Sequence, residues 1–168
     1  MDSPFWNFSV AVYGASGVEG ESLTLQDQFG LDINLVLFCT FLGAAHGIAL
    51  TLDDIAAARQ EIGPWHQDIV STLRAARRRL KTIELRDAGA AKAAADLRSQ
   101  IKAAELESER IEQTMLEQWA KTRFAGRPRG SPRDVAPANL QALLVNYGIE
   151  RLTAADTMRH LIAAALAC

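Results

Sequence analysis

Leu31-Asp32-Ile33-Asn34-Leu35-Val36-Leu37-Phe38-Cys39-Thr40-Phe41-Leu42 is the most apolar stretch of the chain. Wound into a helix, it is hydrophobic on every side rather than along one stripe. A helix of that kind is stable only inside a protein core or a bilayer. We interpret it as the central buried helix of a small all-α protein, with the other helices packed around it.

A membrane span is the alternative to a core helix for this stretch. No residue between Asp32 and Asp53 carries a fixed charge, a distance close to the length that crosses a bilayer. The second half of that interval, however, contains Gly43, His46 and Gly47, and both flanks are acidic. A spanning helix normally has Lys or Arg near one end. The sequence therefore favours a buried core helix without a membrane span.

The charges are distributed unevenly along a chain of ordinary composition. Its 168 residues, 49% apolar and 23% charged, are typical of one soluble globular domain. All 18 Lys and Arg residues lie from Arg59 onward, whereas the segment from Met1 to Ala58 holds seven acidic residues (Asp2, Glu19, Glu21, Asp27, Asp32, Asp53 and Asp54). Such asymmetry indicates either a polar partner or one half of the fold packed on the other.

Catalytic and metal-binding patterns are missing from the sequence. Cys39 and Cys168 give neither a disulfide framework nor metal-ligand spacing, and His46, His66 and His160 lie far apart. No Gly-rich phosphate loop or nucleophile elbow occurs. We therefore expect no metal, no cofactor and no catalytic residue. The first residues lack the basic region of a signal peptide, which favours a reducing cytoplasm.

Helix punctuation divides the expected single all-helical domain into four parts. Ser3-Pro4 is typical of a helix start, and three capping boxes begin at Ser16, Thr51 and Thr153. Gly63-Pro64 is expected to break or kink the chain. The predicted parts are an acidic N-terminal helical cluster (1–62), a long antiparallel helical hairpin (64–123), a basic Pro/Gly loop (124–136) and a C-terminal helix pair (137–168).

A repeat with steps of four and three residues predicts the hairpin. Two segments that carry it are expected to fold about Gly89, which places Leu80 near Leu97 and Leu73 near Ala104. Ala and Ser at several repeat positions would let the backbones approach closely. In the second segment the repeat consists of Ala90, Ala94, Leu97, Ile101, Ala104, Ser108, Ile111 and Met115.

An Arg-rich segment is the first candidate for a functional site. Arg74, Arg77, Arg78 and Lys81 fall on one side of a predicted helix. They could bind an anionic ligand, remain solvated, or pack against the acidic first 58 residues. Nucleic acid is disfavoured as a partner because the other surfaces are acidic or balanced and no aromatic residues are interleaved with the cations.

Two further sets of residues are candidates. Asp32 and Asn34 enter the most apolar helix, so their polar atoms need partners. They could cap that helix, or line a polar pocket reached by an arginine of the hairpin. Arg127, Arg129 and Arg133 lie in the basic loop, which could be a mobile linker or a docking loop for an acidic partner.

Several stretches resemble a proteobacterial family of small soluble helical proteins, catalogued only as a domain of unknown function. They are Phe5-Trp6-Asn7-Phe8-Ser9, Tyr13, Gly17-Val18, Leu25-Gln26, residues 30–38, Trp65 and residues 73–81. The similarity covers the first half of the chain well and the second half loosely. It implies a bacterial, cytoplasmic, helical protein, and it brings no activity, substrate or cofactor.

The absence of catalytic motifs and the repeat with small residues favour a non-catalytic interaction or scaffold protein. The hairpin and the loop with Arg127, Arg129 and Arg133 would present the surface for a protein partner, and the repeat could continue into a homodimer. The alternative is a pocket, enzymatic or merely binding, for a small anionic or amphipathic ligand. Its candidate residues are Asp32, Asn34, Arg74, Arg77, Arg78 and Lys81.

Overall fold

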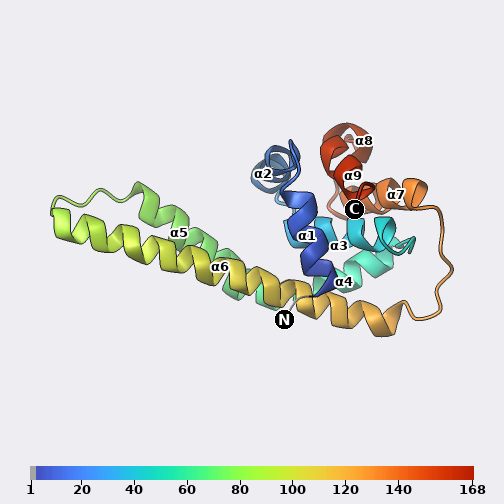
Figure 1. Cartoon of the computed structure of the whole chain (residues 1–168), viewed down its shortest axis with the longest axis horizontal. Helices are drawn as coiled ribbons and strands as arrows, with labels where there is room; N and C mark the ends of the chain where they lie inside the picture. Colours follow the sequence, from blue (N-terminus) through green and yellow to red (C-terminus); the bar gives the residue numbers. More distant parts are fainter. Residues whose placement is uncertain (1–2) are drawn as a thin grey trace. The chain divides into compact units, whose positions relative to one another are not determined.

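The protein is all-α, as the sequence predicts. A computed structural model describes residues 3–168, and in this range every regular element is helical apart from one isolated antiparallel bridge between Ile48 and Arg129. None of the helices described is both long and apolar enough to cross a bilayer. The elements are α1 (Pro4–Tyr13), α2 (Val18–Phe29), α3 (Ile33–Ala44), α4 (Leu52–Trp65), the π-helix η1 (His66–Val70), α5 (Ser71–Thr82), α6 (Ala88–Arg123), α7 (Pro132–Asn146), α8 (Ala154–Thr157) and α9 (Arg159–Ala165) (Figure 1).

The helices gather into two compact units. The core unit comprises Met1–Glu61 and Gln113–Cys168, and the hairpin unit comprises Ile62–Glu112. The long helix α6 contributes its first part, up to Glu112, to the hairpin unit and its remainder to the core unit. That the whole chain forms a single domain stays a prediction.

Helix α3 is the centre of the core unit, which confirms the prediction of a buried central helix. Every residue from Asn34 to Gly43 is buried. Its main neighbour is α7 (Figure 1), and the two backbones approach so closely that a Cβ on Gly43 would lie 2.6 Å from Ala136 Cα. On another side α1 packs against it, with the Phe5 and Phe41 rings stacked at 5.1 Å. Apolar contacts around all of α3 explain why its sequence has no polar face.

A buried asparagine joins α7 to the segment that follows α3. The Asn139 amide nitrogen donates to the carbonyl oxygens of Cys39 at 3.1 Å and Ile48 at 2.9 Å. Its Oδ1 accepts a hydrogen bond from the Leu50 backbone N–H at 2.8 Å. The Ile48 carbonyl and the Leu50 N–H lie outside the helices, so one side chain pairs two backbone groups that helical hydrogen bonding does not satisfy and adds a bond to the Cys39 carbonyl within α3.

Most of the predicted helix starts are confirmed. Ser3 Oγ accepts from the Trp6 backbone N–H at 3.0 Å, and Thr51 and Asp54 form a reciprocal capping box. The box predicted at Ser16 is wrong. Gly17 precedes α2 instead, with φ +86° and no side-chain cap, because the left-handed conformation there suits glycine.

The C-terminal part differs from the prediction in its helix bounds. Helix α7 begins at Pro132, where a proline at the first helical position fits, so the irregular stretch between α6 and α7 is shorter than predicted. The expected last helix is divided at Met158 into α8 and α9. The Glu21 carboxylate of α2 accepts hydrogen bonds from the backbone N–H groups of His160 (2.9 Å) and Leu161 (3.0 Å), and therefore caps α9.

The hairpin unit consists of η1 and α5 running antiparallel to the first part of α6 (Figure 1). A break or a kink is predicted at Gly63-Pro64, and the break does not occur, because α4 continues through Pro64 to Trp65 and passes directly into η1. The kink stays a prediction. The Ser71 backbone N–H donates to the His66 carbonyl, five residues back, which is the π-helical pattern. The change in helix geometry thus falls just after the proline.

Candidate functional site

The interior of the hairpin is polar. Of the α6 residues in the hairpin unit, Glu105, Ser108 and Glu112 are buried, with exposures of 6%, 4% and 0%. Leu97, which the sequence places in the hairpin seam, is 47% exposed. Carboxylates are among the side chains least often buried, and they need partners when they are. We therefore regard this polar seam as the candidate functional site.

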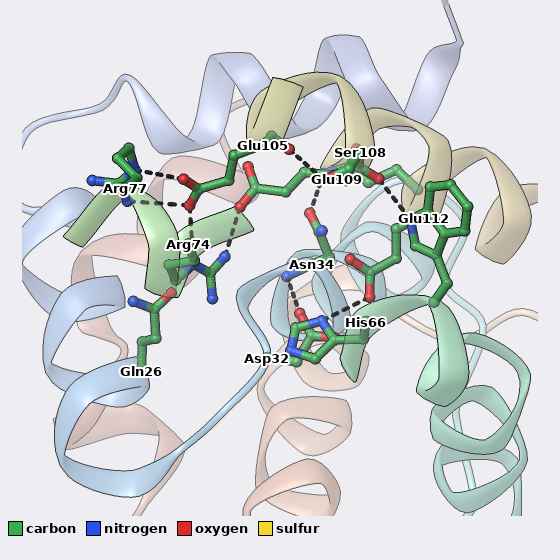
Figure 2. A network of polar contacts seen from close by, with 12 residues as sticks. Gln26, Asp32, Asn34, His66, Arg74, Arg77, Glu105, Ser108, Glu109 and Glu112 are labelled. Carbon is green, nitrogen blue, oxygen red and sulfur yellow. Dashed lines mark hydrogen bonds and ion pairs between the residues drawn. The ribbon is translucent and has the colours of Figure 1, made fainter. Parts of the chain in front are cut away.

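Arg74 lies between two glutamates of α6 (Figure 2). Its Nε donates to Glu105 Oε1 at 3.1 Å, and its Nη2 donates to Glu109 Oε1 at 2.6 Å. The Arg74 side chain is only 17% exposed. Burial alone would lower the pKa of Arg74, but the charges and hydrogen bonds of Glu109 and Glu105 outweigh burial and raise it. The guanidinium therefore stays charged inside the seam.

Arg77 binds the same carboxylate from one turn further along α5 (Figure 2). Its Nε and Nη2 donate to Glu105 Oε2 at 2.5 Å and Oε1 at 3.1 Å, a two-pronged geometry. Burial alone would raise the pKa of Glu105, but the hydrogen bonds from Arg77 and Arg74 lower it. The pKa of Glu109 is raised instead, because burial outweighs the attraction of Arg74. The two neighbouring carboxylates thus differ in acidity because they share the cations unequally.

A second group of contacts lies where η1 begins. His66 Nδ1 is 3.0 Å from Glu112 Oε1, and the Trp65 indole N–H donates to the Ser108 carbonyl oxygen at 3.0 Å. Like the arginine contacts, these join the helical segment before the hairpin turn to α6 (Figure 2). Single π-helical turns occur frequently at functional sites, which also favours this seam as the candidate site.

Comparison with protein-family models gives one match over residues 4–116, to the family described as "Protein of unknown function (DUF2390)". The chain belongs to this family. The match includes the whole hairpin unit and ends within α6. No curated protein and no solved structure matches the chain. The resemblance to a family of unknown function is confirmed, and membership supplies no activity, substrate or cofactor.

The predicted ligand residues of the hairpin are divided between the seam and the surface. Arg74 and Arg77 lie in the seam and share Glu105, whereas Arg78 and Lys81 are exposed on α5. All four lie within the part of the chain that the DUF2390 family model matches.

Asp32 and Asn34 belong to the core unit. The Asp32 carboxylate caps α3 by accepting the Asn34 backbone N–H at 2.9 Å, as one of the two interpretations predicts. The Asn34 side-chain oxygen accepts from Gln113 Nε2 at 2.8 Å. Burial is the main reason that the pKa of nearby Tyr147 is raised, and the Asp32 charge adds to it. These contacts satisfy polar groups at the start of an otherwise apolar helix.

The three arginines predicted as a docking loop also separate. Arg127 pairs with the buried Asp54 at 2.5 Å and donates to the Ala49 carbonyl oxygen at 3.1 Å. Arg129 and Arg133 are exposed. They lie outside the residues that the family model matches.

Sequence reasoning missed the partners of the arginines. Glu105, Glu109 and Glu112 occupy steps of four and three residues on α6, the same spacing as the predicted apolar repeat. Placed opposite an α5 whose charged residues are all cations, that acidic row indicates a charged seam.

Proposed function

We propose that this member of the DUF2390 family is a non-catalytic helical interaction or scaffold protein that presents its hairpin unit to a protein partner. The observation that carries the proposal is a partly inverted hairpin: charged side chains lie in its seam beside few aliphatic ones such as Val70, and several large aliphatic side chains lie outside. Leu97, Leu106 and Ile111 of α6 are 47%, 54% and 40% exposed. Ile69, Ile83 and Leu85 of the same unit are exposed as well.

The inversion is unfavourable for a hairpin that acts alone. Full burial of an aliphatic side chain is worth roughly 1.5–3 kcal/mol, so each of these side chains, about half exposed, forgoes roughly half of that. Ion pairs such as Arg74–Glu105 replace apolar contacts in the seam, and buried pairs of this kind add little net stability. What they supply is a defined register, since each arginine reaches particular carboxylates. A hairpin with a fixed register and an aliphatic exterior is suited to binding.

The test is partner capture with a matched control. Wild-type protein, Leu97→Glu and Leu23→Glu are used as baits, and retained proteins are identified by mass spectrometry, purified and rebound. Leu97, 47% exposed, lies on the hairpin, and Leu23, 44% exposed, lies on α2 of the core unit. We expect Leu97→Glu to abolish rebinding of a purified partner and Leu23→Glu to preserve it. Equal binding by both variants would contradict the proposal.

The proposal includes a cytoplasmic, bacterial setting. Both Cys39 and Cys168 are free thiols, which agrees with a reducing compartment.

A pocket for a small anionic or amphipathic ligand remains the second proposal. Arg74 and Arg77 would supply cations to it, but both are already neutralised by Glu105 and Glu109, so an anion would have to displace a carboxylate. Native mass spectrometry of protein purified gently from its own host provides the test. An excess mass that disappears in Arg77→Ala would support this proposal, and bare protein would contradict it.

A further inference from the structure

Only one of the two apolar rows of the α6 repeat faces into the hairpin. Ser108 is buried, and Ala94 and Ile101 of its row are half-buried. The second row consists of Ala90, Leu97, Ala104 and Ile111, spaced seven residues apart, and all four are exposed. A seven-residue apolar row is the pattern by which helices pair side by side. Helix α6 therefore carries an unused pairing surface, which we call the outer row.

The outer row is complementary to itself. Small and large residues alternate along it. Leu97 and Ala104 lie at equal distances in sequence from a point between positions 100 and 101, and so do Ala90 and Ile111. When two copies are placed antiparallel about a two-fold axis between positions 100 and 101, Leu97 meets Ala104 of the second copy. The same placement sets Ile111 against Ala90 of the second copy. Large side chains opposite small ones interdigitate without voids.

We propose that the occupant of the outer row is a second copy of this chain, docked antiparallel through α6. This inference rests on the proposed interaction function and names the partner. The paired segment spans residues 90–111, which is about 32 Å at roughly 1.5 Å per residue. A two-fold axis makes the contact isologous, so the assembly closes as a dimer.

The charges beside the outer row agree with this arrangement. The flank that two antiparallel copies bring together contains Ala93, Gln100 and Glu107, all exposed. Glu107 comes opposite Ala93 of the second copy, and the two Gln100 side chains meet near the axis. No like charges face each other along this flank. A parallel pairing in register would instead oppose Leu97 to Leu97 and Glu107 to Glu107.

Sedimentation of the full chain over a wide concentration range tests the pairing. We expect a monomer–dimer equilibrium in wild type and a rise of about tenfold or more in the dissociation constant for Leu97→Glu. Leu106→Glu is the matched control. Leu106 is nine residues from Leu97, about half a turn away at roughly 100° per residue, so this variant should dimerise as wild type does. Circular dichroism confirms that each variant folds.

Cysteine pairing distinguishes the antiparallel register from the parallel one. In a Cys168→Ser background, which removes the exposed native thiol, Leu97→Cys and Ala104→Cys chains are oxidised separately and as a mixture. Antiparallel pairing predicts that the mixture forms covalent dimer faster than either chain alone. Faster cross-linking of the separate chains would overturn the proposed register.

The outcomes separate this inference from the proposed function. A wild-type chain that is monomeric at every concentration, or one whose dimer Leu106→Glu disrupts as strongly as Leu97→Glu, overturns the self-pairing. If such a chain still binds a purified partner through its hairpin, the interaction function stands and only the identity of the partner is wrong.

Discussion

Replacing Asp54 with asparagine tests how the core unit fixes the start of α4. The Asp54 side chain is 3% exposed. Its Oδ2 accepts from the Thr51 backbone N–H at 3.0 Å and from Arg127 at 2.5 Å. Its Oδ1 accepts from Arg123 Nε at 3.2 Å. Asparagine retains the volume and one acceptor, and it removes the charge that holds both arginines.

The size of the effect follows from the acidity of the carboxyl group. Burial alone would raise the pKa of Asp54, but hydrogen bonds from Arg127 and Thr51 lower it from 3.8 to about 2. Each pKa unit corresponds to about 1.4 kcal/mol, so the folded state favours the carboxylate by about 2 kcal/mol. Arg127 and Arg123 are 30% and 40% exposed and regain water when the charge is lost. The cost therefore stays below the 3–5 kcal/mol typical of a fully buried pair.

The pH dependence has a definite sign. Because the folded-state pKa is lower than the unfolded one, the Asp54 carboxylate stabilises the protein fully above pH of about 4. This stabilisation is lost as pH falls through about 2. Asp54→Asn should therefore lower the free energy of unfolding by about 2 kcal/mol at neutral pH, and the difference from wild type should shrink in acid.

Urea denaturation provides the assay, followed by both circular dichroism and tryptophan fluorescence so that coincident transitions justify a two-state fit. The matched control is Asp53→Asn, one residue earlier in the same helical turn and exposed. We expect little change in that variant. Equal losses in the two variants, or a loss in Asp54→Asn that does not depend on pH, would refute the electrostatic explanation.

Three other substitutions probe the remaining polar and close contacts. Asn139→Leu leaves the Ile48 carbonyl and the Leu50 N–H without their side-chain partner, so thermal denaturation should show a loss of about 3 kcal/mol; an unchanged midpoint would contradict that role. Gly43→Ala places a methyl group against Ala136 and should cost about 1–3 kcal/mol, whereas Gly20→Ala, which has open space, should be neutral or stabilising. Glu105→Gln removes the carboxylate shared by two arginines and should speed amide hydrogen exchange in α5 while leaving exchange in α3 unchanged. Exchange rates in α5 equal to those of wild type would argue against the seam as the source of register.

Local features of the fold were readable from the sequence because they depend on neighbouring residues. The Ser3 cap, the capping box at Thr51 and the Asp32 cap each need only a side chain and a backbone N–H within three positions. The burial of α3 was equally clear, since a helix that is apolar all round has no solvent face.

Other features depend on which residues meet across the chain, and no local pattern specifies that. Asn139 looks like an ordinary polar residue of α7 until its partners, Cys39 and Ile48, are brought to it. In the hairpin, the four-three repeat predicted a helix pair but not which row would face inward. The arginines of α5 determine which row faces inward, because a contact between Arg74 and Glu105 is more favourable than a contact between Arg74 and a leucine.

The π-helical turn η1 explains how one continuous helical path supplies both groups of seam contacts. An unbroken α-helix turns about 100° per residue. In such a helix the side chains of Arg74 and Arg77 would on average point about 100° away from those of Trp65 and His66. The extra residue in a π turn cancels one such step, so both groups face α6. Deleting Asp68, an exposed residue of η1, removes the extra residue, so an α-helical turn should replace η1 and leave Arg74 facing Glu105. We expect helix content by circular dichroism and hairpin stability by urea denaturation to stay close to wild type. Asp68→Ala keeps the chain length and should behave in the same way; a loss of several kcal/mol in the deletion variant alone would contradict the alignment role of η1.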